Sequence, residues 1–232
     1  SGDGDVAGMN WNFWVIQAFN GVSYGALLFL VGSGLSLIFG VMRIVNLSHG
    51  SYFLLGGYVA LTVIWTTGSW LLALPVAAIA IGLVGLAMER VFLRPLGFDP
   101  LRQVLLTVGF AFLFQQAALD IWTGNNFDIS PPPALSQSVS IGGIYFPLYR
   151  MFMIGIALAI GLTLYLIMEK TRVGAMVRAT VDDAQMARGI GIDTSRVSMM
   201  IFSLGAALAA LGGVIGGAFL GVYIGLDFEM LP

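Results

Sequence analysis

Residues 197–226 read VSMMIFSLGAALAALGGVIGGAFLGVYIGL, a run without Asp, Glu, Lys or Arg. A helix needs about 20 apolar residues to cross the hydrocarbon core of a bilayer. Helices in lipid gain little from hydrophobic burial, so close approach of their backbones supplies packing energy. Because small residues recur through this run, it predicts a membrane-spanning helix that packs closely against a neighbour.

The small residues at every fourth position of this run form one stripe. The stripe comprises Gly205, Ala209, Gly213, Gly217, Gly221 and Gly225. One Gly-x-x-x-Gly spacing is weak evidence, whereas five consecutive steps of four residues indicate a helix contact. Two interpretations remain open: helix packing inside the chain, or a subunit interface or wall of a transport path.

Further uncharged stretches precede this run. Together they define six hydrophobic segments, at about 13–41, 50–66, 70–88, 103–120, 150–168 and 197–225. The first is too long for one simple crossing and contains five glycines, so we expect it to be tilted, broken or partly re-entrant. The sequence therefore predicts an all-α, polytopic membrane protein with about six hydrophobic segments.

The composition excludes several classes of protein. Charged residues make up 9% of the 232 residues, against about a quarter in a soluble domain. The absence of cysteine and the single histidine, His49, exclude disulfides, thiol nucleophiles and multi-His metal centres. The one lysine, Lys170, follows Glu169, whereas a Walker A loop has Gly there. We therefore expect no catalytic residue, no metal site and no cofactor.

The basic residues predict the orientation, because cytoplasmic loops carry an excess of Lys and Arg. One side would hold Arg43, Arg90, Arg94, Arg102, Lys170, Arg172, Arg178, Arg188 and Arg196, and the other only Arg150. The N-terminus, the loop 121–149 and residues 226–232 are then external. Within that loop, residues 138–146 are typical of a short β-hairpin that turns at Gly142 and Gly143.

The start of the chain, residues 1–8, is small and acidic and lacks the basic region of a signal peptide. We expect it to be a short tail or a cloning remnant. Residues 9–232 then form a single transmembrane domain, with a cytoplasmic loop at 169–196 and the external loop at 121–149.

A polar run, Asn46-Leu-Ser-His49-Gly50, separates the first two segments. It is either an interfacial turn or a helix break that exposes polar groups to a substrate or a moving joint. Polar residues at membrane depth are costly and are often functional. Asn20 and Tyr24 form a similar but weaker patch inside the first segment.

The loop 169–196 contains Thr180-Val-Asp-Asp183, which matches a capping box and predicts a helix that begins near Val181. We expect Gly189 or Gly191 to end it, and Asp193 or Thr194 to cap the next segment. This short helix is either a connector or a docking knob for a cytoplasmic partner.

Several motifs now resemble one family. Phe39-Gly-Val-Met-Arg-Ile-Val-Asn46-Leu-Ser-His49-Gly50 is similar to the signature of LivH-type permeases, the membrane subunits of branched-chain amino acid ABC importers. Glu89-Arg90 with Arg94-Pro95-Leu96 also fits. So does the spacing of glycines, alanines and charges over 171–192, which resembles the family's cytoplasmic coupling loop.

The resemblance implies the fold of the second class of ABC importer permeases. In that family, two permease subunits form the path, two cytoplasmic ATPase subunits power it, and a periplasmic binding protein delivers the amino acid. It implies a heterodimer of permeases in the bacterial inner membrane, in contact with lipid and with no nucleic acid. ATP hydrolysis is expected on the separate ATPase subunits. The family's chains continue past residue 232, so this chain is C-terminally short relative to them.

The resemblance also assigns roles. The residues implied in ATPase coupling are Gly174, Arg178, Ala179, Asp182, Asp183, Met186, Ala187 and Gly191. From their polarity alone, Asn20, Tyr24, Asn46 and His49 are the residues expected along the substrate path. Branched-chain or other hydrophobic amino acids are the expected substrates; urea, short amides or aromatic compounds are the alternatives within the family. A solo channel or secondary transporter is the alternative from another class.

Overall fold

A computed structural model describes residues 3–97 and 99–230. The long helices are α1 (Asp3–Met42), α2 (His49–Thr67), α3 (Trp70–Met88), α4 (Pro100–Trp122), α5 (Leu148–Lys170) and α8 (Thr194–Leu220). The short elements are η1 (Glu89–Leu93), η2 (Arg94–Leu96), η3 (Pro133–Leu135), α6 (Arg172–Asp182), α7 (Ala184–Gly189), α9 (Leu226–Glu229) and the strands β1 (Ser138–Ile141) and β2 (Ile144–Pro147).

All six hydrophobic segments form helices, as predicted, except that the last helix ends at Leu220, so the prediction is wrong for residues 221–225. Five helical stretches are long and apolar enough to cross a membrane: Trp11–Met42, Trp70–Leu96, Pro100–Trp122, Leu148–Lys170 and Thr194–Leu220. The sixth helix, α2, is not among them. It begins with His-Gly-Ser-Tyr, and its first thirteen residues, apart from Val59, are buried.

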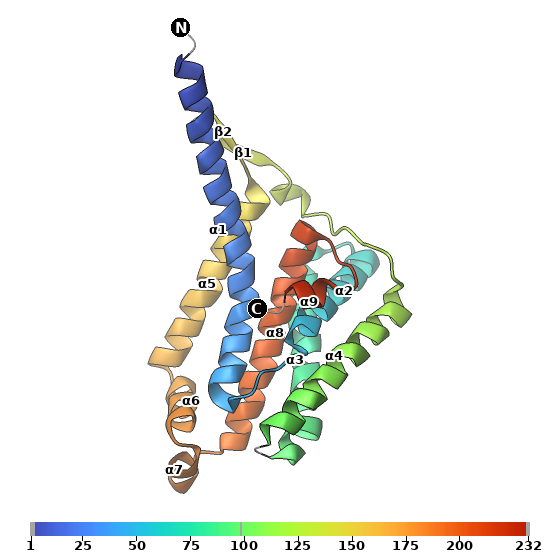
Figure 1. The fold of residues 1–232 in the computed structure, drawn as a ribbon, viewed down its shortest axis with the longest axis vertical. Coiled ribbons are helices and arrows are strands. Elements are labelled where there is room, and N and C mark those ends of the chain that lie inside the picture. The colour runs from blue at the N-terminus through green and yellow to red at the C-terminus, as the bar shows by residue number, and fades with distance from the viewer. Residues whose placement is uncertain (1–2, 98, 231–232) are drawn as a thin grey trace.

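The first segment is one continuous helix. At 1.5 Å per residue, the 40 residues of α1 measure about 60 Å, so one end projects beyond the rest of the molecule (Figure 1). Residues 3–8, which the sequence predicted as a tail, continue this helix, and residues 1–2 lie outside the described residues. The glycines of this segment therefore do not break it.

The basic residues gather at one end of the bundle. Arg43 follows α1, Arg90 and Arg94 lie in η1 and η2 directly after α3, and Arg102 lies in the first turn of α4. These ends meet α6 and α7 at the bottom of Figure 1. Arg150 lies in the first turn of α5, at the opposite end. This is the asymmetry that the sequence predicted, and we refer to the two ends as cytoplasmic and external.

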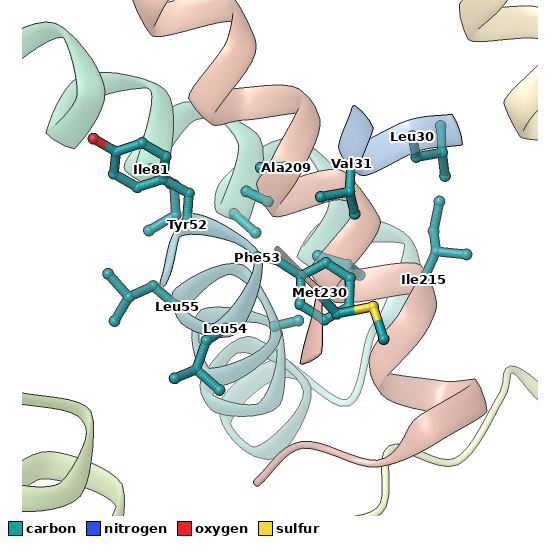
Figure 2. Close-up of a cluster of buried hydrophobic side chains, with 14 of the residues drawn as sticks. Leu30, Val31, Tyr52, Phe53, Leu54, Leu55, Ile81, Ala209, Ile215 and Met230 are labelled. Atoms are coloured by element: carbon teal, nitrogen blue, oxygen red, sulfur yellow. The ribbon is translucent and has the colours of Figure 1, made fainter. Parts of the chain in front are cut away.

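The glycine stripe places α8 at the centre, against α1, α2 and α3. A Cβ on Gly205 would lie 2.7 Å from Ile38 of α1, and a Cβ on Gly213 would overlap the carbonyl oxygen of Phe53 in α2. Figure 2 shows Phe53 in this core, with Val31, Ile215 and Met230 around it. The stripe thus packs within the chain as far as Gly217.

The external loop contains the predicted hairpin. Strands β1 and β2 are antiparallel, with Ile141 paired to Ile144, and Gly142 and Gly143 adopt positive φ in the turn. An isolated bridge between Phe127 and Val222 attaches the loop to the segment that follows α8. The loop is therefore fixed to the external end of the central helix.

Candidate functional site

The segment 43–48 returns into the membrane. Helix α1 ends at Met42, Arg43 has a φ of +56°, and α2 begins at His49. The Nε2 atom of His49 lies 3.0 Å from the carbonyl oxygen of Val31. Val31 lies eleven residues before the end of α1, or about 16 Å along a helix, and the hydrocarbon core is about 30 Å thick. Helix α2 therefore begins near the middle of the bilayer.

Short polar contacts hold this break. Asn46 Oδ1 accepts hydrogen bonds from the backbone N–H of Ser48 at 3.1 Å and from its hydroxyl at 2.7 Å. The Leu47 N–H donates to the hydroxyl of Thr107 in α4. These bonds satisfy backbone groups that lipid cannot satisfy. The segment 43–48 is thus a helix break inside the membrane that its own hydrogen bonds stabilise, and not an interfacial turn.

Two buried nitrogens in the break have no hydrogen-bond partner in the described part of the chain: Asn46 Nδ2 and His49 Nδ1. A carbonyl oxygen only accepts, so Nε2 of His49 carries the proton that reaches Val31, and Nδ1 of the neutral ring is an acceptor. The structure therefore brings together a spare donor and a spare acceptor on two residues that the sequence singled out.

The other two residues of the predicted path lie elsewhere. Asn20 is eleven residues before Val31, which places it about 16 Å further toward the external end. Its Oδ1 accepts a hydrogen bond from Arg150, whose guanidinium lies 5.0 Å from the ring centre of Phe219. Tyr24 is 39% exposed. Asn20 and Tyr24 thus belong to the external part of α1, apart from Asn46 and His49.

Sequence reasoning missed Asp227. After α8, Gly221 and Gly225 adopt positive φ, and α9 folds back against α2. Asp227 is 1% exposed, its backbone lies against Gly50, and its Oδ2 accepts a hydrogen bond from Ser51. The prediction that 226–232 is external is therefore wrong for 226–230, and 231–232 lie outside the described residues.

The cytoplasmic loop forms two helices. Thr171 caps α6 through the N–H of Gly174, and Asp183 caps α7 through the N–H groups of Gln185 and Met186. The capping box at Thr180 is wrong, because that hydroxyl bonds the Met176 carbonyl inside α6. The predicted end of the helix is confirmed: α7 ends at Gly189.

The next cap is also confirmed, since the N–H of Arg196 donates to Asp193 at the start of α8. The second part of the predicted helix is therefore present as α7. The first part of the predicted helix belongs instead to the end of a separate helix, α6. Helix α7 begins at Ala184, three residues after the predicted start at Val181. Asp183 is the N-cap in place of Thr180, because its carboxylate accepts hydrogen bonds from two backbone N–H groups.

We call residues 172–191 the α6–α7 knob; it projects below the cytoplasmic ends of α1 and α5 (Figure 1). Gly174 packs against the carbonyls of Ile167 and Met168, and Arg178 donates to the Met168 carbonyl, so both fix the elbow between α5 and α6. Ala179 is half-buried and Asp182 is exposed at the end of α6.

The tip of the knob is apolar and exposed. Met186 is 69% exposed and Ile190 is 76% exposed, whereas Ala187 between them is buried. Gly191 has a φ of +89° and turns the chain toward α8. An exposed apolar tip on a short capped helix suits the groove of a partner protein.

Arg43 connects the knob to the break. Its Nη2 donates to the carbonyl oxygen of Val181, at the end of α6, at 3.1 Å. Beside this bond lies a hollow of about 370 Å³ that is lined by the end of α1, the start of α4 and residues 180–184. Arg43 is the first residue of the re-entrant segment 43–48, so this hydrogen bond links that segment directly to the knob.

We expect Arg43→Gln to weaken this connection. Loss of one charged hydrogen bond at an exposed site removes about 1 kcal/mol, which corresponds to a decrease of about fivefold in substrate moved per ATP. The measurement is uptake and ATP hydrolysis side by side in membrane vesicles. The control is Arg90→Gln, at the same end but without a hydrogen bond to the knob in the described structure. Equal uptake per ATP in the two variants would contradict a role for Arg43.

Comparisons with known proteins agree with these features. Residues 17–230 match a family model described as branched-chain amino acid transport system, permease component. The high-affinity branched-chain amino acid transport system permease protein LivH of Salmonella typhimurium is 30% identical, over 92% of this chain and 74% of its own length. BraD of Pseudomonas aeruginosa, with the same description, is 26% identical over 89% of this chain and 71% of its own.

A more distant relative is the autoinducer 2 import system permease protein LsrC of Shigella flexneri, 28% identical over 62% of this chain and 40% of its own. No solved structure gives a significant match. The match to the family model includes both the re-entrant segment and the α6–α7 knob.

Proposed function

The chain belongs to the family of permease components of branched-chain amino acid transport systems, and on this premise we propose that it translocates branched-chain or other hydrophobic amino acids as the membrane-spanning subunit of an ABC importer. It is a multi-pass protein of the inner membrane. The observation that carries the proposal is the bond between Arg43 and Val181, which joins an exposed cytoplasmic knob to a helix break in mid-bilayer.

The proposal assigns ATP hydrolysis to two separate ATPase subunits, because the one lysine of this chain does not follow a glycine as a Walker A loop requires. A second permease subunit completes the path, and a periplasmic binding protein delivers the substrate to the external end. The α6–α7 knob is the surface that we assign to an ATPase subunit.

The mechanism is alternating access. ATP binding closes the two ATPase subunits and displaces the knob, and Arg43 passes this displacement to the segment 43–48 at the start of α2. An ATPase can drive such a change only if the knob makes different contacts in the two states. The path then changes the side on which it is open.

The substrate class follows from the interior. The helices around α2 present mainly aliphatic and aromatic side chains, and the buried polar residues include four in or beside the helix break, Asn46, Ser48, His49 and Ser51. An apolar path with a few polar groups suits an amino acid whose side chain is hydrophobic and whose head group needs hydrogen bonds. The relatives named above as branched-chain amino acid permeases support the same class.

The test of the proposal is uptake of radiolabelled leucine by cells in which the gene for this chain is deleted. Uptake should be lost, and expression of the chain should restore it. The complex purified through this chain should contain an ATPase, a second permease and a binding protein. Normal leucine uptake in the deleted cells, with no other leucine importer present, would refute the proposed substrate.

Met186→Asp is expected to release the ATPase subunits. The substitution puts a charge at the centre of the exposed apolar tip, and burial of an unpaired charge in an interface costs several kcal/mol. Co-purification with the tagged chain measures the result, and the ATPase yield should fall at least about tenfold. The control is Tyr145→Asp, an equally exposed position on the external hairpin. Retention of the ATPase by Met186→Asp would remove the knob from the interface.

A further inference from the structure

Asp227 is an acid inside the membrane without a cationic partner. The two ion pairs among the described residues, Asp99 with Arg102 and Asp193 with Arg196, both lie at the cytoplasmic end. The chain carries ten Lys and Arg residues, and all of them lie within three residues of an end of a long helix or in the short elements that connect the long helices. A carboxylate buried at membrane depth is costly and marks a functional site unless it serves structure alone.

Hydrogen-bond donors and the N-terminus of a helix surround the carboxyl group of Asp227. It lies beside the first turn of α2, where the helix dipole attracts negative charge. Ser51 donates to its Oδ2 at 3.4 Å, and backbone amides of α9 face the same carboxylate. Gly50 allows this approach, because a side chain there would overlap the backbone of Asp227. The fold thus holds a carboxylate at the start of a mid-membrane helix.

Part of this carboxylate is unused. Oδ1 of Asp227 is buried and has no hydrogen-bond partner in the described part of the chain. The hydroxyl of Tyr58 is equally buried and unpartnered, and it lies close enough to Asp227 for the two groups to interact electrostatically. Tyr58 follows Ser51 by seven residues, two turns along the same face of α2. The two unpartnered oxygens, Oδ1 of Asp227 and the hydroxyl of Tyr58, therefore lie on the face of α2 that carries Ser51.

The wall beside this face is aromatic. The ring of Tyr58 stacks on that of Trp122, with centroids 5.1 Å apart, and the ring of Phe127 lies nearly perpendicular to it, with centroids 6.4 Å apart. Aromatic faces attract ammonium groups as well as apolar side chains. A carboxylate next to such a wall suits a ligand that combines a cation with a hydrocarbon group.

We infer that Asp227, together with Ser51 and Tyr58, forms a site inside the membrane for a primary ammonium group. A primary ammonium has three donors and no acceptor, which complements a carboxylate with an unused oxygen. The inference rests on the proposed function in one respect: the ligand in transport is then the α-ammonium of the amino acid. Asp227 binds the head group beside Ser51, whereas the ring of His49, two residues earlier, faces the carbonyl oxygen of Val31.

The chain contains no cysteine, so Ser51→Cys gives a single reporter thiol in this site. We would label it, in membranes that contain the whole transporter, with a trimethylammonium-ethyl or a sulfonato-ethyl methanethiosulfonate. The cationic reagent should react about tenfold faster, since a fixed charge in a confined site concentrates the opposite charge. Asp227→Asn, which keeps the shape, should abolish the preference.

The matched control is Glu229→Gln, which removes a carboxylate two residues away. Glu229 is exposed and accepts a hydrogen bond from Tyr223, so the preference should persist in this variant. Equal rates for the two reagents, a preference that survives Asp227→Asn, or no labelling during turnover would each overturn the inference.

Ligand protection separates this inference from the proposed function. 3-Methylbutylamine, which has the ammonium and the hydrocarbon chain of leucine but no carboxylate, should slow the labelling, whereas 4-methylpentanoate, which lacks the ammonium, should not. If the amine protects and leucine uptake does not depend on the chain, the site stands and the proposed function fails. If uptake depends on the chain and neither compound protects, the proposed function stands and the site fails.

Discussion

Gly191→Pro is expected to abolish ATP-driven uptake while the chain still inserts into the membrane. Gly191 has a φ of +89° and its N–H donates to the carbonyl of Arg188. Proline fixes φ near about −65° and has no N–H, so the turn between α7 and α8 cannot form. We expect uptake to fall at least about tenfold, because a 1 Å misplacement of a functional element can cost more than that. Uptake by membrane vesicles measures the loss.

The matched control is Gly68→Pro. Gly68 also has a positive φ, of +69°, and its N–H also donates to a helix carbonyl, that of Ile64. It lies at the external end, in the turn between α2 and α3, away from the knob. Both variants lose the same local geometry, so similar uptake in the two would show that the turn at Gly191 has no special part in coupling.

Gly213→Val is expected to prevent normal packing of the bundle. A Cβ at Gly213 would overlap the carbonyl oxygen of Phe53 and approach the N–H of Gly57, so backbone atoms of α2 would have to move. Overpacking of a core costs about 1–3 kcal/mol, and more where backbone must shift. The thermal midpoint of the purified chain, measured by loss of the monodisperse peak after heating, should fall by several degrees, about 4 °C or more.

Gly155→Val is the control for size and β-branching. Gly155 lies in α5, and nothing stands within 4 Å of a Cβ built there. Its thermal midpoint should match that of the parent chain. A midpoint for Gly213→Val that equals the control would mean that α2 and α8 do not approach as closely as described here.

The helices could be predicted from the sequence because charge-free runs of sufficient length have one stable form in lipid. The continuity of α1 could not. Gly21, Gly25, Gly32 and Gly40 have no neighbour near their Cβ positions, whereas Gly34 lies against Gly205. Glycine composition alone does not separate glycines that break a helix from those that simply leave space on its surface.

The site could be predicted only in part. Asn46 and His49 stood out because polar residues in an apolar sequence are rare, and the structure buries both in one break. Asp227 was assigned to the outside because the orientation predicted from the basic residues places 226–232 on that side. The return of α9 depends on contacts with Gly50 and Ser51, about 175 residues earlier in the chain. A pattern read over a short stretch of sequence cannot predict a contact between residues so far apart.

The depth at which α2 begins has an electrical consequence. A cation that moves from the external side to a point near the middle of the bilayer crosses about half of the membrane potential, which is worth about 1 kcal/mol per 100 mV. Leucine carries no net charge and crosses the same distance without electrical work. Protonated 3-methylbutylamine carries one positive charge, so its movement does involve electrical work. The voltage across a vesicle therefore shifts the affinity of the mid-membrane carboxylate for the amine and leaves that for the amino acid unchanged.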